Sequence, residues 1–183
     1  MSEEMMIEHC SPTLAGIKTA NMITCPYASI EEMRESVRHW NKALSKKGLR
    51  VLPLRYAKGR GLIYIYRPSM LSEDLHDCRA REILRECGYR AGTPEACIVQ
   101  LVKRLDQQEE FPHEIGLFLG YPPEDVNGFI VNKAGHSKYS GYWQVYGDEE
   151  KAKRTFARYK TCTRIYCEQH ARGESVEQLA VNR

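Results

Sequence analysis

The sequence of 183 residues has no long apolar run and no strong excess of one charge. A membrane-spanning helix needs roughly 20 consecutive apolar residues, so we expect no membrane segment. The first residues are acidic and lack an apolar run, so we also expect no secretory signal. The formal net charge of +3 is far from the strongly basic balance of dedicated nucleic-acid-binding proteins, which predicts no nucleic-acid partner.

Several short motifs are also missing. The sequence contains neither the Gly-x-Gly-x-x-Gly pattern of dinucleotide-binding folds nor a Walker-type phosphate loop. The seven cysteines have neither zinc-ribbon nor thioredoxin spacing, which disfavours a structural zinc ion. An odd number of cysteines in a chain of this size indicates reduced thiols, so we expect a cytoplasmic protein.

The composition is that of a globular protein, with 42% hydrophobic and 28% charged residues. A chain of this length is typical of one domain. We therefore predict a single α+β domain over residues 1–172, followed by a tail at 173–183 that is expected to fray.

Hydrophobic periodicity and helix-start signals predict helices over residues 12–24, 29–47, 70–87, 93–105, 123–131 and 148–171. Apolar runs bounded by turn residues predict strands over residues 49–56, 62–66, 115–119 and 142–146. The first two strands flank a glycine-containing turn and read as a hairpin. The predicted fold class is therefore α+β, with a small, mostly antiparallel sheet of about four strands covered by roughly five to seven helices.

Cys10 lies in the segment His9-Cys10-Ser11-Pro12, immediately before a predicted helix start. The positive end of a helix dipole stabilises a thiolate, and this is one way in which catalytic cysteines are activated. Cys10 is therefore a candidate nucleophile. The alternative is a small buried residue that precedes a helix beginning with proline.

A histidine begins the predicted strand at 115–119, within Pro112-His113-Glu114-Ile115-Gly116. Its ordinary pKa lies near neutrality, which makes His113 a candidate general base. Gly116 inside a strand suggests close approach by another backbone or by a ligand. The alternative for His113 is a hydrogen-bonded histidine at a sheet edge.

Further polar residues could complete a site. Cations such as Lys18 and Arg67 lower the pKa of a nearby thiol or hold an anionic ligand. The polar loop at 132–141 contains His136, and loops of this kind often carry binding groups. The candidate ligand-binding residues are Lys18, Arg67, Glu114, Tyr121 and His136.

The segment His113-Glu-Ile-Gly-Leu-Phe-Leu-Gly120 resembles the histidine strand of the papain-like NlpC/P60 cell-wall peptidases. In that family a catalytic cysteine sits at a helix N-terminus upstream of the histidine. The resemblance implies a thiol-dependent hydrolase or acyl transferase with Cys10 as nucleophile and His113 as base.

A second resemblance covers nearly the whole chain. The segments Pro112-His-Glu-Ile-Gly116, Leu119-Gly-Tyr-Pro122 and Trp143-Gln-Val-Tyr-Gly147 are similar to an uncharacterised family of short proteins from anaerobic bacteria. This resemblance implies a flavodoxin-type redox partner. It also makes haem or flavin a candidate cofactor.

Three functions follow from these observations. The first is a ligand-binding or accessory protein, redox- or iron-linked, with a pocket around Cys10 and His113 that takes a small molecule or peptide. The second is the thiol-dependent enzyme. The third is a protein-interaction module that uses the Tyr-Pro-Pro turn and the loop at His136.

Overall fold

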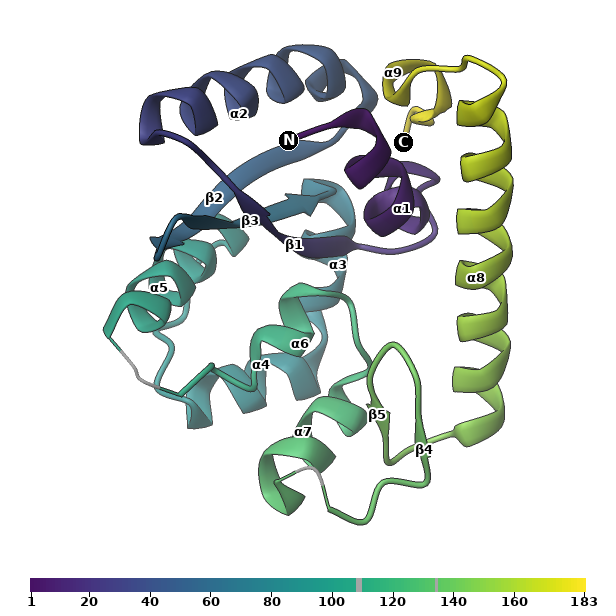
Figure 1. The fold of residues 1–183 in the computed structure, drawn as a ribbon. Helices are drawn as coiled ribbons and strands as arrows, with labels where there is room; N and C mark the ends of the chain where they lie inside the picture. Colours follow the sequence, from purple (N-terminus) through teal and green to yellow (C-terminus); the bar gives the residue numbers. More distant parts are fainter. Residues whose placement is uncertain (108–109, 134) are drawn as a thin grey trace. The chain divides into compact units, whose positions relative to one another are not determined.

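The computed structural model describes residues 1–107, 110–133 and 135–183, and the chain forms two compact units (Figure 1). Unit 1 comprises residues 1–69 and 159–183, and unit 2 comprises residues 70–158. Unit 2 is thus inserted into the sequence of unit 1. The α+β class is confirmed, because helices accompany a small antiparallel sheet. The single domain over 1–172 stays a prediction.

The elements have the following bounds. The helices are α1 (Glu3–Leu14), α2 (Ile30–Leu44), the 3-10 turn η1 (Ser45–Lys47), α3 (Pro68–His76), α4 (Cys78–Glu86), α5 (Pro94–Gln107), α6 (Ile115–Phe118), α7 (Pro123–Asn132), α8 (Glu149–Ala171) and α9 (Val176–Leu179). The strands are β1 (Ala20–Pro26), β2 (Arg50–Ala57), β3 (Arg60–Tyr66), β4 (Tyr139–Ser140) and β5 (Gln144–Val145).

The sheet of unit 1 has the strand order β1-β3-β2, and both pairings are antiparallel. The predicted hairpin is confirmed as β2 and β3, and β3 is the central strand. Side chains alternate along β3: Ile63 and Ile65 enter the apolar core, while the rings of Tyr64 and Tyr66 stack 4.6 Å apart. The register of β2 shifts at Pro53, which has no N–H to donate to the ladder.

The apolar core of unit 1 lies between this sheet and helices α1 and α2 (Figure 1). Helix α2 begins as predicted, because the Ser29 hydroxyl accepts a hydrogen bond from the Glu32 amide at 3.1 Å. Its buried residues Met33, Trp40 and Leu44 recur at helical spacing and contribute to this core. The fold of unit 1 thus follows from the largely buried helix α1, the amphipathic helix α2 and a three-stranded sheet.

The helix predicted over residues 12–24 is wrong. Helix α1 begins earlier, where the Ser2 hydroxyl accepts a hydrogen bond from the Met5 amide, and it ends two residues after Pro12. The following residues form β1, which pairs with β3 over seven residue pairs. Ser11 and Pro12 lie near the end of α1 and not at a helix start, and pairing with β3 outweighs the local helical pattern of residues 20–24.

Residues 173–183, which were expected to fray, contain α9 and contribute to the core of unit 1. Val176 and Ala180 are buried there. The Val181 amide donates to the Leu14 carbonyl at 3.1 Å, and the Val181 carbonyl accepts from Arg67 at 3.0 Å. These contacts tie the last residues to α1 and to the end of β3.

Unit 2 is mostly helical. Helix α7 contacts α4, α6 and β5 within this unit. The strand predicted over residues 115–119 is wrong, because that segment contains the short buried helix α6. The strand predicted over 142–146 shrinks to Gln144–Val145, which pairs with Tyr139–Ser140. Within the described ranges, no helix has both the length and the apolar character that crossing a membrane requires.

Candidate functional site

Unit 2 contains a pocket of about 380 Å³ at the segment where His113 lies. Its walls are largely aromatic, and we call it the aromatic pocket. The aromatic side chains that line it are Phe111, Tyr121, Phe129, Tyr142 and Trp143. His113 and Gln144 also line it and carry polar groups that could contact a ligand. Its volume lies within the usual range for small-molecule sites of about 300–1,000 Å³.

Helix α6 and the turn after it place the first wall. A Cβ atom on Gly116 would come within 2.8 Å of Val126 and 3.0 Å of the Tyr121 ring. Only glycine therefore allows Tyr121 and helix α7 to pack this closely against α6. Sequence analysis predicted a close approach at this glycine. The approach is made by two neighbouring side chains.

Asp125 fixes the opposite wall. Its carboxylate is buried and accepts three hydrogen bonds, each 2.7 Å long. The donors are the Trp143 indole N–H and the amides of Tyr146 and Gly147. One carboxylate at the start of α7 therefore holds the whole Trp143–Gly147 segment in place.

The rings of the pocket pack on one another. Trp143 stacks on Tyr121 with centroids 4.8 Å apart and meets Phe156 edge-on at 4.5 Å. His113 is exposed, and its ring contacts Phe129 edge-on at 4.9 Å. Burial raises the pKa of the Tyr121 phenol to about 12, so this ring is uncharged at neutral pH. The pocket thus presents neutral aromatic faces with a histidine at their edge.

Glu114 follows His113 but belongs to a separate buried cluster. Its carboxylate accepts a hydrogen bond from the Tyr89 hydroxyl at 3.1 Å and lies 3.7 Å from the Arg104 guanidinium. Arg104 also lies over the Tyr89 ring and donates to the Cys87 carbonyl. Burial, reinforced by Glu114, raises the pKa of Tyr89 above its usual range. The carboxylate of Glu114 is therefore engaged by Tyr89 and Arg104 and does not line the aromatic pocket.

Cys10 lies in the last part of α1 and is fully buried, which corrects its predicted place at a helix N-terminus. Burial raises the pKa of its thiol to about 12, and the nearby Lys18 opposes this shift. A thiol of this kind is almost entirely protonated at neutral pH and is a poor nucleophile. Cys10 belongs to unit 1 and His113 to unit 2, so neither unit by itself contains the predicted pair.

The two candidate cations are also buried in unit 1. Lys18 donates from Nζ to the Ala20 carbonyl, and burial lowers its pKa to about 7. Arg67 is fully buried and donates four hydrogen bonds to main-chain carbonyls. The acceptors belong to Thr13, Leu14, Lys47 and Val181. These bonds direct the guanidinium to the backbone and fix the ends of α1, η1 and the tail.

His136 is exposed, lies in a left-handed backbone conformation with φ 58°, and does not line the aromatic pocket. Of the predicted site residues, His113 and Tyr121 share this pocket. Sequence analysis missed Asp125, Phe129 and Trp143 as its other walls. The signal was present, since Trp143-Gln-Val-Tyr-Gly147 and Leu119-Gly-Tyr-Pro122 both carried the family resemblance and both reach this pocket.

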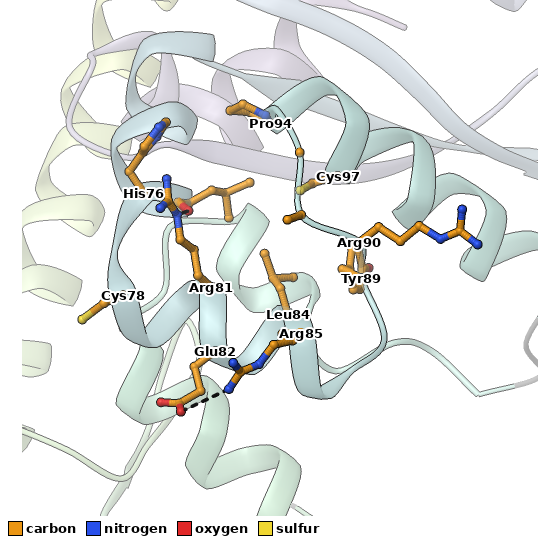
Figure 2. A pocket seen from close by; sticks show the side chains of 13 residues that line it. His76, Cys78, Arg81, Glu82, Leu84, Arg85, Tyr89, Arg90, Pro94 and Cys97 are labelled. Carbon is orange, nitrogen blue, oxygen red and sulfur yellow. Dashed lines mark hydrogen bonds and ion pairs between the residues drawn. The ribbon is translucent and has the colours of Figure 1, made fainter.

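A second and larger hollow of unit 2, about 600 Å³, is lined by residues from the end of α3 to the start of α5. Figure 2 shows Arg81 beside His76 on one side and Pro94 with Cys97 on another. We call it the arginine pocket, because Arg81, Arg85 and Arg90 all line it.

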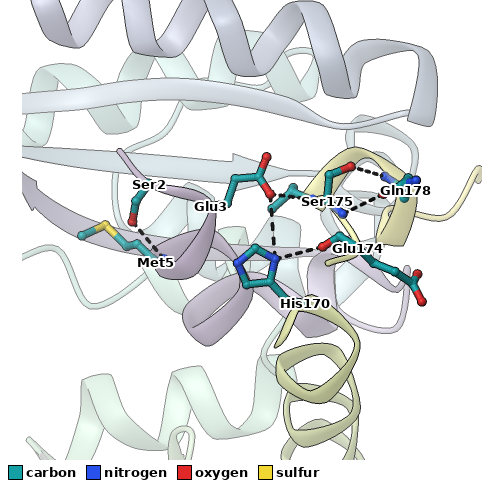
Figure 3. A network of polar contacts seen from close by, with 8 residues as sticks. Ser2, Glu3, Met5, His170, Glu174, Ser175 and Gln178 are labelled. Atoms are coloured by element: carbon teal, nitrogen blue, oxygen red, sulfur yellow. Dashed lines mark hydrogen bonds and ion pairs between the residues drawn. The ribbon is translucent and has the colours of Figure 1, made fainter. Parts of the chain in front are cut away.

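A polar network in unit 1 joins the start of α1 to the end of α8 (Figure 3). Glu3 accepts a hydrogen bond from the Val176 amide at 3.2 Å and lies 3.8 Å from the His170 ring nitrogen. The same ring nitrogen lies 2.9 Å from the Glu174 carbonyl oxygen. Ser175 and Gln178 form a reciprocal capping box on α9. The network secures the starts of α1 and α9 and the end of α8.

Among the residues that the structure describes, no three histidine, cysteine, aspartate or glutamate side chains are grouped so that they could hold a metal ion. All seven cysteines are free thiols; Cys78 is exposed, whereas Cys10, Cys25 and Cys97 are buried.

Comparison with known proteins gives the family. Residues 6–180 match the model of the family described as Protein of unknown function (DUF3793). The chain belongs to this family. No curated protein and no solved structure matches the chain. The match covers both units, so the inserted unit 2 and the aromatic pocket are within the part of the chain that defines DUF3793.

Proposed function

We propose that this DUF3793 protein binds a planar, mostly apolar ligand in the aromatic pocket of unit 2. The observation that carries the proposal is the combination of five aromatic side chains and one exposed histidine around a hollow of about 380 Å³. Pockets for small molecules are predominantly apolar, with a few polar groups that fix the orientation of the ligand.

The pocket supports binding more strongly than catalysis. Its buried carboxylate, Asp125, has three donors and serves to hold the wall. His113 would contact the polar edge of a ligand, while Tyr121 and Trp143 would offer ring faces. A flavin or haem ligand would give the protein the redox- or iron-linked role that the sequence resemblance implies.

No feature of Cys10 favours the alternative thiol-dependent reaction. A buried thiol with a pKa of about 12 has no thiolate to offer at neutral pH. The pocket at His113 therefore supports a ligand-binding or accessory protein in preference to a cysteine hydrolase.

Trp143 provides the test, because the chain has only two tryptophans and Trp40 lies in unit 1. In the W40F variant, titration with riboflavin should quench the fluorescence of Trp143 in a saturable way. The W143F variant retains only Trp40 and serves as the matched control for optical absorption by the flavin. A parallel titration with haemin, followed by its absorption spectrum, distinguishes haem from flavin.

Two histidine variants locate the site. H113Q, made in the W40F background, should weaken riboflavin or haemin binding by about tenfold, the effect of losing one good polar contact. H136Q should leave binding unchanged, because this exposed histidine lies outside the pocket. The absence of saturable binding of both probes would overturn the proposal, as would equal binding by H113Q and H136Q variants when binding itself is intact.

A further inference from the structure

The aromatic pocket has an acidic wall. Among the described residues that line it, Asp125 carries the only full charge, since His113 is titratable and every other lining side chain is uncharged near neutral pH. Asp125 is 3% exposed, so water and salt screen its charge poorly. Its three hydrogen-bond donors are an indole and two main-chain amides, all of them uncharged. A ligand in this pocket therefore meets a negative potential.

Two lysines of the neighbouring segments have partners of their own. Lys138 is exposed and donates from Nζ to the Gly147 carbonyl at 2.8 Å. Lys153 forms an ion pair with Glu149 at 2.7 Å. Because solvent screens an exposed charge, Lys138 offsets the charge of the buried Asp125 only in part.

The aromatic rings favour the same sign of ligand charge. The face of an aromatic ring carries partial negative charge, so tryptophan, tyrosine and phenylalanine rings attract cations. One cation of the protein already makes such a contact beside the pocket. The Lys153 ammonium lies 5.3 Å from the centre of the Tyr139 ring, which stacks on Phe156. Phe156 in turn contacts Tyr142 and Trp143, two rings that line the pocket.

We propose that the aromatic pocket selects a planar organic cation, such as an N-alkylated nitrogen heterocycle, over a planar anion. This inference rests on the proposed function and adds the charge of the ligand to it. The positive charge would lie toward Asp125, and the ring system would lie against Tyr121 and Trp143. A negative group in the same place would be repelled, so a planar anion should bind more weakly than its neutral counterpart.

Three acridines that share one ring system and differ in charge test this selectivity at pH 8, where an ordinary histidine is uncharged. They are the cation 10-methylacridinium, neutral acridine and the anion acridine-9-carboxylate. Isothermal titration calorimetry of the full chain should show that the cation binds about tenfold more tightly than acridine, the scale of a cation–π contact, and that the anion binds most weakly. The chain's net charge of +3 would produce the opposite order if binding were non-specific.

Two variants locate the charge that is responsible. D125N should reduce the preference for the cation over acridine to about threefold or less, because the buried negative charge is removed. The ratio of the two affinities is the readout, since D125N also disturbs the pocket wall and lowers both. E124Q is the matched control and should keep the preference. It removes the same charge one residue away on α7, but Glu124 is exposed and does not line the pocket.

Each outcome decides the proposal. Equal affinity for the cation and acridine, or tighter binding of the anion, overturns this inference alone if riboflavin or haemin binds saturably. Absence of binding by every acridine, riboflavin and haemin overturns the proposed function as well. An equal preference in D125N and E124Q also overturns the inference. Circular dichroism checks that D125N is folded, and if it is not, the order of the three affinities in the unmodified chain decides.

Discussion

The two units bury charges of opposite sign. Unit 1 encloses two cations, Lys18 and Arg67, and main-chain carbonyls accept their hydrogen bonds. Unit 2 encloses two carboxylates, Glu114 and Asp125. Glu114 accepts a hydrogen bond from a phenol, and Asp125 accepts hydrogen bonds from an indole and two main-chain amides. In both units a buried charge is tolerated because nearby dipoles stabilise it.

The buried charges of the two units have different roles: those of unit 1 are structural, and Asp125 of unit 2 supports a candidate binding site. The partners of Arg67 come from residues 13, 14, 47 and 181, so this cation joins distant parts of the chain and faces the backbone. The carboxylate of Asp125 holds a segment whose other side chains line the aromatic pocket. In unit 1 the buried charge of Arg67 joins distant segments of the chain. In unit 2 the buried charge of Asp125 positions a wall of the aromatic pocket.

The largest expected effect is on unit 1. R67M should lower the free energy of unfolding by roughly 3 kcal/mol or more, because each buried carbonyl left without a donor costs about 1–3 kcal/mol. Urea denaturation followed by Trp40 fluorescence in a W143F background measures this. R38M removes an exposed arginine of α2 and is the control. Equal small losses in both variants would end the structural assignment of Arg67.

A second prediction concerns unit 2. D125N should lower the free energy of unfolding by about 2 kcal/mol, because an amide cannot accept all three hydrogen bonds of the carboxylate. The variant should also weaken binding in the aromatic pocket, since Trp143 loses its partner. Urea denaturation of the W40F background reports on this unit. D106N, at an exposed position of α5, should be neutral.

The third prediction is a pH dependence. Burial lowers the pKa of Lys18 to about 7, whereas an exposed lysine has a pKa of about 10.4. Between these values the unfolded chain binds more protons at Lys18 than the folded chain does. The free energy of unfolding should therefore rise with pH, by up to about 1.4 kcal/mol per pH unit. Below pH 7 this contribution no longer changes, because Lys18 is then charged in both states.

Burial of Cys10 acts in the opposite direction at higher pH. Its folded pKa of about 12 means that above roughly pH 9 the unfolded thiol loses its proton first, which lowers the free energy of unfolding. Urea denaturation between about pH 7 and 8 therefore measures the effect of Lys18 before the thiols of the unfolded chain lose their protons. The rise should disappear in K18M and persist in K42M, which changes an exposed lysine of α2. A slope that survives in K18M contradicts the assignment.

The smallest expected effect is the alkylation of Cys10. Iodoacetamide at pH 7 should modify Cys78 in the folded protein, because this cysteine is exposed, and should reach Cys10 only after denaturation. Mass spectrometry of the peptides distinguishes the two sites. Rapid modification of Cys10 in the folded chain would contradict this prediction and would favour the thiol-dependent enzyme.

Sequence reasoning succeeded where local signals are strong. Ser29 and Glu32 mark the start of α2, Thr93 and Pro94 that of α5, and the turn at 58–59 joins β2 to β3. It failed at α6, because a short apolar run fits a strand or a buried helix equally well. It also failed at β1, whose pairing with β3 joins residues about 40 positions apart.

The site was predictable only in part. His113 and Tyr121 could be chosen because both lie in one unusual segment, and both line the aromatic pocket. Asp125 could not, because its hydrogen bond to Trp143, 18 residues away, leaves no periodic trace in the sequence. Lys18 and Arg67 were chosen for charge alone. Their burial depends on main-chain carbonyls whose positions only the folded chain defines.

The discontinuous sequence of unit 1 has a consequence for synthesis. All of unit 2 is translated before residues 159–183, which complete unit 1. Until Val181 emerges, Arg67 lacks one of its four acceptors and the apolar residues of α9 do not yet cover α1. In nascent chains, unit 2 should therefore become resistant to protease before unit 1. The unit whose synthesis begins first is then the unit that folds last.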